Sequence, residues 1–189
     1  MNSNLPLVSI IVNCHNGQEY LYECLKSITK QTYENWELIF WDNHSSDLSS
    51  KILKSFKDKR IKYFKSNKFT SLYLARNLAI KKAGGKYITF LDTDDIWKKN
   101  KLSIQINFFK KNRDFKVVYS KYIVKKNRNY FNMHKKKLSS GFITQKLLDN
   151  YTIGILTVML EKSIFEKKNF NKKFNIIGDF DFFIKISIF

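Results

Sequence analysis

Three aspartates follow a short apolar segment near the middle of this 189-residue sequence. Residues 86–91, which read KYITFL, are rich in aromatic and β-branched side chains and follow Gly84-Gly85, as is typical of a buried strand. Side chains two positions apart share a side in extended chain, so we expect Asp92 and Asp94 to converge. Two carboxylates together with phosphate oxygens are typical ligands of Mg²⁺ or Mn²⁺. The alternative is a turn whose aspartates cap the next helix.

A second pair of aspartates lies near the end of the chain, in the segment 178–181, which reads GDFD. We expect a helix to begin here, with both carboxylates in its first turn. A carboxylate at that position either caps the backbone N–H groups or acts as a general base that accepts the proton of an attacking hydroxyl. The residues alone leave both roles open for Asp179. They likewise leave Asp42 as a turn or ligand-binding residue and Arg76 as a helix-surface or ligand-binding residue.

Apolar runs in the first half predict strands and helices that would hold these side chains at one edge of a sheet. Helices are expected between and after four predicted strands, so the pattern favours an α/β domain with a parallel, doubly wound sheet. The predicted strands are Leu7–Val12, Trp36–Trp41, Ile61–Phe64 and Lys86–Leu91. The predicted helices are Gln18–Thr29, Ser49–Phe56, Ser71–Ala83 and Lys101–Lys111.

The pattern changes after residue 111, where shorter elements are expected. Short strands are predicted at Phe115–Tyr119, Tyr122–Val124 and Ile155–Leu160, with helices at Phe142–Leu148 and Lys162–Lys168. The basic stretch Lys125–Lys137 is predicted to form a mobile hairpin or loop. No internal repeat or linker divides the sequence, so one domain is expected over residues 1–189.

Composition narrows the class of protein. A hydrophobic content of 43% is enough for a core and excludes a disordered chain. The 35 basic and 16 acidic residues give a net charge of +19, which suits nucleic acid, anionic lipid or a phosphate-bearing substrate. Because lysines are spread along the whole chain beside many Asn and Ile residues, we interpret most of this charge as compositional bias.

Cysteine spacing and apolar run lengths exclude several other classes. Cys14 and Cys24 lack the spacing of a disulfide framework or a zinc site, so both are expected to be small buried thiols. The uncharged run Asn150–Leu160 is too short to span a bilayer, and no secretory signal is evident. We therefore expect a cytoplasmic protein with peripheral contact at the inner face of the membrane.

Four segments occur in an order that resembles the GT-A fold enzymes of glycosyltransferase family 2. They read VSIIVNCHN, QTYENWELIFWDNHSSD, LARNLAIKKAGGKYITFLDTDDIW and GDFDFFIKIS. The resemblance implies an inverting, hexosyltransferase-like enzyme of cell-surface polysaccharide or lipopolysaccharide synthesis. It implies a nucleotide-diphosphate sugar donor, with UDP expected, a glycan or lipid-linked acceptor, and Mn²⁺ or Mg²⁺ as cofactor. It does not imply a nucleic-acid partner.

The resemblance also implies roles for particular residues. Residues 1–100 would form the nucleotide-binding half and residues 101–189 the acceptor half. Asp92 would lie near the ribose, Asp94 would bind the metal and Asp179 would be the general base. The remaining residues implied to contact the nucleotide or donor are Asn13, His15, Asn16, Asp42 and Arg76.

The sequence also departs from the family pattern. Cys14-His15-Asn16 stands where Thr-Tyr-Asn is usual, and Gly178-Asp179 replaces a Glu-Asp pair. Family members generally continue past the last helix, whereas this sequence ends at Phe189, about two or three turns into it, as in a truncated version. A catalytically weak protein that binds sugar nucleotides is therefore one alternative to an active transferase.

Two other classes of function were weighed. A sugar nucleotidyltransferase would need a glycine-rich basic phosphate loop after the first strand, which is lacking. A basic module that binds nucleic acid or an anionic surface would use Lys125–Lys137 with Tyr122, Tyr130 and Phe131. Against it, the carboxylates of residues 92–95 repel phosphates unless a metal intervenes.

Overall fold

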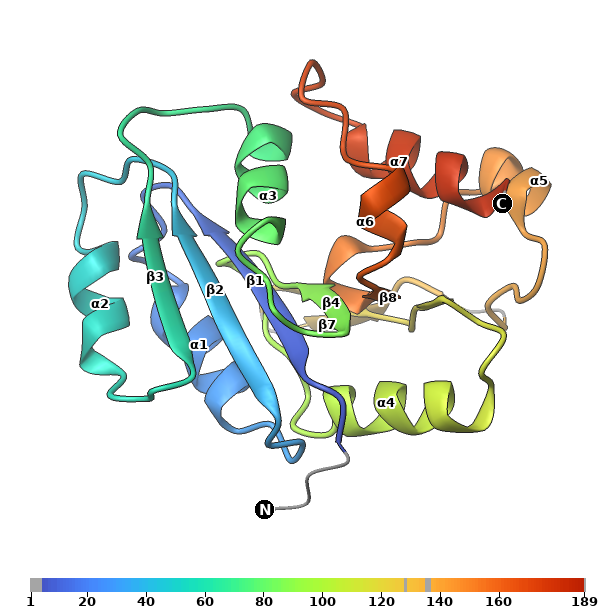
Figure 1. The fold of residues 1–189 in the computed structure, drawn as a ribbon, viewed down its shortest axis with the longest axis horizontal. Coiled ribbons are helices and arrows are strands. Elements are labelled where there is room, and N and C mark those ends of the chain that lie inside the picture. The colour runs from blue at the N-terminus through green and yellow to red at the C-terminus, as the bar shows by residue number, and fades with distance from the viewer. Residues whose placement is uncertain (1–4, 128, 135–136, 189) are drawn as a thin grey trace.

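The computed structural model describes residues 5–127, 129–134 and 137–188. Strands and helices alternate in the first half, as the apolar pattern predicts (Figure 1). These elements are β1 (Val8–Cys14), α1 (Leu21–Thr29), β2 (Trp36–Asp42), α2 (Ser49–Ser55), β3 (Ile61–Lys65), α3 (Leu72–Ile80) and β4 (Tyr87–Phe90). The second half comprises α4 (Lys101–Lys111), β5 (Val117–Val118), β6 (Ile123–Lys126), β7 (Asn129–Asn132), α5 (Thr144–Asp149), the 3₁₀ turn η1 (Ile155–Thr157), β8 (Met159–Glu161), α6 (Ile164–Lys167) and α7 (Gly178–Ser187).

The central sheet is mostly parallel, which confirms the predicted α/β class. Its strand order is β3-β2-β1-β4-β8-β5. The first four strands pair in parallel, whereas β8 runs antiparallel to β4 and β5. Because parallel strands end on the same side, the residues that follow β1, β2, β3 and β4 meet along one border, which we call the carboxyl edge. Ligands of open α/β sheets bind outside such an edge.

Helices cover both faces of the sheet. Side chains alternate between the two faces along each strand, and both sets are apolar, so each face needs helices to bury it. Val8, Ile10 and Val12 belong to a core that includes Leu25 of α1 and the inner residues of α4. Ile11 belongs to a second core with α3, α6 and α7. All four β1 side chains are at most 1% exposed, so the strand is buried on both faces.

Several predicted boundaries were wrong, each for a local reason. β1 extends to Cys14, because its pairing with β2 continues to the register pair Cys14 and Asp42. Of the predicted strand Ile155–Leu160, only Met159 and Leu160 belong to a strand, β8, and the first three residues form η1. There Thr157 donates both its backbone N–H and its hydroxyl to the carbonyl of Gly154, at 2.9 and 2.7 Å. These bonds favour a turn within an apolar segment.

A hairpin is present as β6 and β7, which pair antiparallel, but it begins at Ile123, inside the predicted strand Tyr122–Val124, and β7 ends at Asn132. Arg128, Lys135 and Lys136 of the predicted stretch lie outside the described residues. Cys14 and Cys24 are buried free thiols, as predicted. Within the described ranges, no helix combines the length and the apolar character needed to cross a bilayer.

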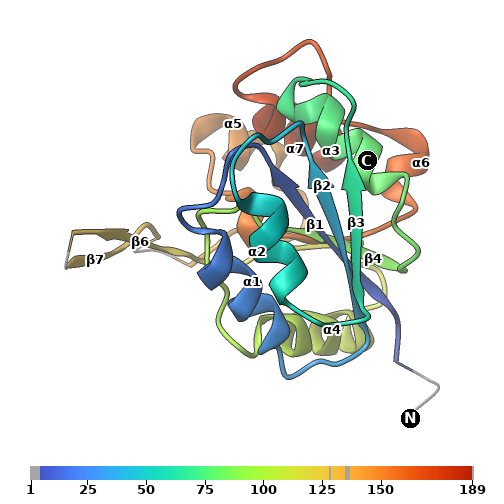
Figure 2. The same cartoon turned by 90° about the vertical axis from the view of Figure 1, so that its left-hand side faces the viewer.

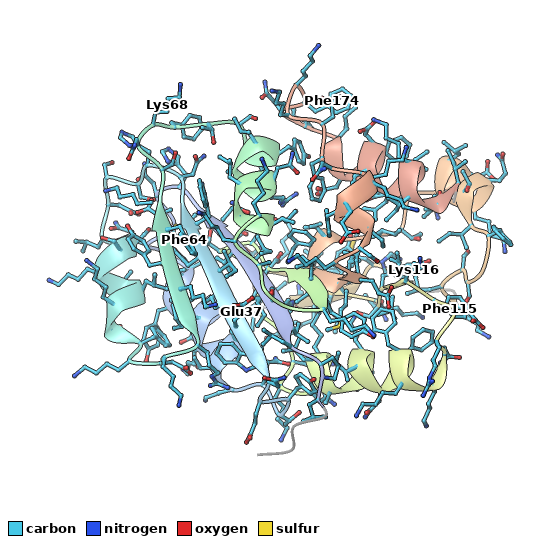
Figure 3. All side chains as sticks on the ribbon, viewed as in Figure 1. Glu37, Phe64, Lys68, Phe115, Lys116 and Phe174 are labelled. Atoms are coloured by element: carbon cyan, nitrogen blue, oxygen red, sulfur yellow. The ribbon has the colours of Figure 1, made fainter. Side chains whose placement is uncertain are left out.

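A buried carboxylate joins three segments away from the carboxyl edge. Glu37 of β2 is 4% exposed and accepts hydrogen bonds from the hydroxyl of Ser9 at 2.5 Å and the backbone N–H of Gly84 at 2.6 Å. Lys62 forms an ion pair with it at 2.6 Å. Burial would raise the pKa of Glu37, but these three donors outweigh it and hold the pKa below its usual range. Figure 3 shows Glu37 on the sheet, away from the loops that carry Lys68 and Phe174.

We predict that Glu37→Ala lowers the free energy of unfolding by about 2–4 kcal/mol, because it leaves the buried hydroxyl of Ser9 and the partly buried N–H of Gly84 without their acceptor. Glu37→Gln keeps an acceptor oxygen and loses only the partner of the half-exposed Lys62, so its effect should be less than half as large. Urea unfolding of both variants measures this difference. Equal losses would show that the ion pair, and not the buried hydrogen bonds, provides the stabilisation.

Candidate active site

A buried arginine joins two predicted site residues at the carboxyl edge. Arg76 of α3 is 1% exposed. Its Nη2 donates to both carboxylate oxygens of Asp92 at 3.0 and 3.2 Å, and its Nη1 donates to Oδ1 of Asp179 at 2.5 Å. Asp92 follows β4, whereas Asp179 lies in the first turn of α7. One guanidinium therefore connects three segments that are far apart in the sequence.

Helix α3 holds Arg76 by burying one side. The hydroxyl of Ser71 caps the helix by accepting from the N–H of Leu74 at 3.4 Å. The guanidinium lies among aromatic rings, 5.6 Å from the centre of Tyr73, 6.0 Å from Phe90 and 5.7 Å from Phe170. Burial would lower the pKa of Arg76, but the charges of Asp92 and Asp179 outweigh it and raise the pKa. Arg76 is thus a permanent cation, and both of its Nη atoms are bound to carboxylates.

Asp179 does not cap α7. No side-chain cap bond is present at the start of this helix, and the Asp179 carboxylate points to Arg76 instead. Within the described part of the chain, its second oxygen, Oδ2, has no hydrogen-bond partner, and the side chain is 26% exposed. Burial raises the pKa of Asp179, Arg76 lowers it and the charge of Asp92 raises it, with a net increase. A carboxylate with a raised pKa and a free oxygen is suited to accept a proton.

The backbone at the start of α7 is strained. Ile177 has φ of 57°, which is unusual for a β-branched residue. The next residue must be glycine, because a Cβ at Gly178 would overlap the ring of Tyr73. The hydroxyl of Tyr73 in turn accepts the N–H of Gly178 at 2.9 Å. The glycine that replaces the family's glutamate is therefore matched to a tyrosine on α3.

The acidic segment after β4 is a turn and not extended chain. The N–H of Asp95 donates to the carbonyl of Asp92 at 3.1 Å. The expected convergence of Asp92 and Asp94 by two-residue alternation was therefore based on the wrong backbone. Asp92 turns toward Arg76, whereas Asp94 is exposed to solvent. Burial, and then the charges of Asp92 and Asp94, raise the pKa of Asp95 to about 7.

The carboxylates fit a divalent cation only in part. Among the described residues, no group of three or more His, Cys, Asp or Glu side chains could hold a metal ion. Exposed Asp94 offers hard oxygen ligands, and the carboxyl groups of Asp92 and Asp95 belong to the same turn. One or two carboxylates suffice for Mg²⁺ or Mn²⁺ when substrate phosphates supply further oxygens. The donor set therefore suits a cation that is bound together with a diphosphate.

Loops after β1, β2 and β3 bring an aromatic pair to the same edge. Exposed His15 lies with its ring centre 4.4 Å from that of Phe69, which is 59% exposed. Nδ1 of His15 is 3.0 Å from the carbonyl of Asn43, so Nδ1 carries the proton and Nε2 is left as an acceptor in the neutral ring. The amide of Asn43 also binds the backbone N–H and carbonyl of Thr70, at 3.1 and 2.8 Å. Asn43, in the loop after β2, thus holds the loop of His15 and the loop of Phe69 in place.

The other residues predicted to contact the nucleotide differ in exposure. Nδ2 of Asn13 is buried and has no hydrogen-bond partner in the described ranges. Asn16 is exposed with φ of 52°, and its side chain accepts from the N–H of Ser46 at 2.9 Å. Asp42 is fully buried, and its oxygens accept from the N–H of Ser45 and the hydroxyl of Tyr63, both at 2.7 Å.

The first loop also lies against the acidic turn. A Cβ at Gly17 would come within 3.0 Å of Oγ1 of Thr93. The structure therefore brings the aromatic pair, the acidic turn and the Arg76 cluster to one edge of the sheet. The roles of these residues in binding and catalysis stay predictions.

Sequence reasoning missed four residues of this region, namely Asn43, Tyr63, Phe69 and Tyr151. The signal for Phe69 was an aromatic residue in a polar loop after a predicted strand, where burial would not be expected. Tyr151 gave no local signal. Its hydroxyl is buried without a hydrogen-bond partner in the described part of the chain, and its ring packs edge-on against Phe180, 5.2 Å between centres.

This geometry agrees with comparisons to known proteins. The model of the family "Glycosyl transferase family 2" matches residues 9–182. The chain therefore belongs to glycosyltransferase family 2. The chain is also similar to the Staphylococcus aureus protein TarS, residues 1–349, solved in complex with UDP. The TM-score is 0.77 at 23% identity, over 91% of this chain and 52% of that one. This likeness confirms the expected GT-A fold.

Two curated relatives come from Escherichia coli, and both are described as UDP-Glc:alpha-D-GlcNAc-diphosphoundecaprenol beta-1,3-glucosyltransferases. WfgD is 38% identical over 165 residues, which cover 87% of this chain and 64% of the relative. WfaP is 40% identical over 122 residues, which cover 65% of this chain and 48% of the relative. The chain thus spans about half to two thirds of the length of these relatives.

We predict that Asp95→Asn raises the stability of the protein at neutral and higher pH, by on the order of 1–3 kcal/mol. The folded pKa of about 7 lies above the ordinary value, so the native state binds the proton more tightly than the unfolded state. Stability of the unaltered protein should therefore fall as pH rises from about 4 through 7. The variant lacks this ionisation.

Urea unfolding at pH 5 and pH 8, in the presence of a chelator, measures the effect. The unaltered protein should lose more stability between pH 5 and pH 8 than Asp95→Asn does. A smaller loss should remain in the variant, because the pKa of Asp179 is also raised. The same loss in both proteins would contradict the assignment of the raised pKa to Asp95.

Proposed function

We propose that this protein transfers a sugar from a UDP-sugar to a hydroxyl of a lipid-linked sugar, with inversion at the transferred carbon. The observation that carries the proposal is the meeting of Asp92, Arg76 and Asp179 at the carboxyl edge, beside the acidic turn and the His15–Phe69 pair. The relatives WfgD and WfaP support the substrate classes, since both are described as using UDP-Glc and a diphosphoundecaprenol-linked acceptor. The product would serve cell-surface polysaccharide synthesis.

The base of the donor would lie in the aromatic pair. Exposed aromatic rings provide stacking surfaces for a nucleobase. The acceptor Nε2 of His15 and the unpartnered amide Nδ2 of Asn13 would add hydrogen bonds to its edge. Asp42 would act mainly through Tyr63 and the turn at Ser45, because its side chain is fully buried.

Asp94 would hold a divalent cation together with the donor diphosphate. When bound, such a cation stabilises the negative charge that develops on the departing diphosphate. A solved mannosyltransferase of the same fold, from Pyrobaculum calidifontis, is described in complex with GDP-Man and Mn²⁺. It is 15% identical to this chain with a TM-score of 0.68, over 90% of this chain and 49% of that one. The residues that support the assignment here are Asp94 and its acidic neighbours.

Asp179 would be the general base. Its Oδ2 would accept the proton of the acceptor hydroxyl while the hydroxyl oxygen forms a bond to the anomeric carbon and the bond from that carbon to the diphosphate breaks. Arg76 holds the other oxygen, Oδ1, at 2.5 Å and so fixes the orientation of the carboxylate. Arg76 would not neutralise the donor diphosphate directly, because its side chain is 1% exposed and both Nη atoms are bound to Asp179 and Asp92.

Calorimetric titration of UDP with and without Mn²⁺ tests the donor site. We expect Mn²⁺ to strengthen UDP binding in the unaltered protein and to have no effect in Asp94→Ala, because the variant lacks the carboxylate that would bind the cation. Asp179→Asn should bind UDP normally but transfer sugar to a lipid-diphosphate-linked acceptor at least about 100-fold more slowly.

The matched control is Asp114→Ala, which removes an exposed aspartate from the loop after α4. It should leave both UDP binding and transfer unchanged. Metal-stimulated binding that persists in Asp94→Ala, or full transfer by Asp179→Asn, would refute the corresponding role.

We also predict that Phe69→Ala weakens UDP binding by roughly 5- to 100-fold, because it removes one stacking surface for the base. Phe69→Tyr preserves the ring and should bind within about twofold of the unaltered protein. Phe142→Ala serves as the control, since Phe142 is another aromatic residue and is 94% exposed. Unchanged affinity in Phe69→Ala would place the base elsewhere.

A further inference from the structure

The hairpin of β6 and β7 extends away from the rest of the domain. Figure 2 shows it at the left, beyond the sheet and the helices that cover it. All eight residues of the two strands are exposed. The strands pair with each other, with Val124 opposite Phe131 and Lys125 opposite Tyr130. An isolated two-stranded hairpin is marginally stable in water, so an exposed arm of this kind favours a partner that covers it.

The hairpin carries large apolar side chains that are each at least 40% exposed. Tyr130 is 69% exposed and Phe131 is 49% exposed. Ile123 and Val124 of the partner strand are 50% and 40% exposed, and Met133, just after β7, is 51% exposed. Clustered apolar groups of this size mark interaction sites more often than single exposed residues do.

The sequence around the hairpin is strongly basic. The segment from Lys116 to Lys146, both included, holds nine basic residues and no acidic one, so all 16 acidic residues of the chain lie elsewhere. Because side chains alternate along a strand, Lys125 shares a face with Tyr130 and Lys126 shares the other face with Phe131. The ammonium group of Lys125 lies 5.9 Å from the centre of the Tyr130 ring. Each face thus combines a cation with an aromatic ring.

The root of the hairpin adjoins the proposed acceptor side of the site. The ring of Tyr122, just before β6, lies against Gly154, where a Cβ would come within 3.1 Å of its Cε1 atom. Three residues earlier, Tyr151 packs against Phe180, the neighbour of Asp179. A partner bound to the hairpin would therefore have a fixed position relative to the proposed base.

We propose that the β6–β7 hairpin docks this protein on an anionic bilayer surface. This inference rests on the proposed function in one respect, namely that a lipid-linked acceptor lies at such a surface. Lysines attract anionic headgroups, and tyrosine and phenylalanine side chains occupy the boundary between headgroups and acyl chains. The aliphatic Ile123, Val124 and Met133 add apolar area that suits lipid and has no stacking role toward nucleic acid.

Co-sedimentation with phosphatidylcholine vesicles, with and without phosphatidylglycerol, tests the proposal. We expect binding only to the vesicles that contain phosphatidylglycerol. The charge variant Lys125→Glu/Lys126→Glu and the apolar variant Tyr130→Ser/Phe131→Ser should each bind on the order of tenfold or more weakly. Matched changes on α4, Lys110→Glu/Lys111→Glu and Ile104→Ser, should bind as the unaltered protein does, because these residues are also exposed but lie outside the hairpin.

UDP titration of the same variants separates this inference from the proposed function. Normal UDP binding together with lost vesicle binding supports docking by the hairpin. Vesicle binding that needs the hairpin supports docking even if UDP does not bind, in which case only the proposed function fails. Equal vesicle binding by hairpin and α4 variants overturns the inference. Binding of a single-stranded RNA oligonucleotide that depends on Lys125 and Lys126, without vesicle binding, overturns it in favour of a nucleic-acid partner.

Discussion

The site depends on the pairing of one buried guanidinium with two carboxylates. An unpaired charge in the position of Arg76 would cost several kcal/mol, and its pairing with Asp92 and Asp179 offsets that cost. Asp179 belongs to α7, which packs on the same face of the sheet as α3. The pairing therefore links the docking of the last helix to the geometry of the acidic turn, and it positions the proposed base as a consequence of folding.

Most of the first half of the fold could be predicted from the sequence, because its signals are local. The apolar runs of β1 and β2 are buried on both faces. In the second half, α4 also has the predicted bounds Lys101–Lys111. The later elements were harder to predict, because their structure depends on single hydrogen bonds or on distant partners. In η1, the bonds of Thr157 to Gly154 override an apolar pattern that also suits a strand.

The candidate site was predicted as a set of residues but not as a set of contacts. The aspartates and Arg76 were identified individually, and their roles in binding and catalysis stay predictions. The contacts of Arg76 with Asp179 span 103 positions in the sequence, and no spacing rule reaches that far. The contact between Gly178 and Tyr73 was likewise not predictable from the sequence, because the two residues are far apart in it. Only the folded structure shows that the tyrosine ring occupies the space of a Cβ at Gly178.

The charges at the carboxyl edge constrain how a diphosphate could bind there. Arg76 already forms ion pairs with Asp92 and Asp179, and the exposed Asp94 adds a further negative charge. Burial, and then the charges of Asp92 and Asp94, raise the pKa of Asp95, so the ionised form of this carboxyl is disfavoured in the turn. A diphosphate would increase the repulsion unless a cation came with it. Under the proposed function, a divalent ion bound to the donor would offset the charge of both the acidic turn and the phosphates. The same carboxylates would then repel free phosphate and favour a metal-bound donor.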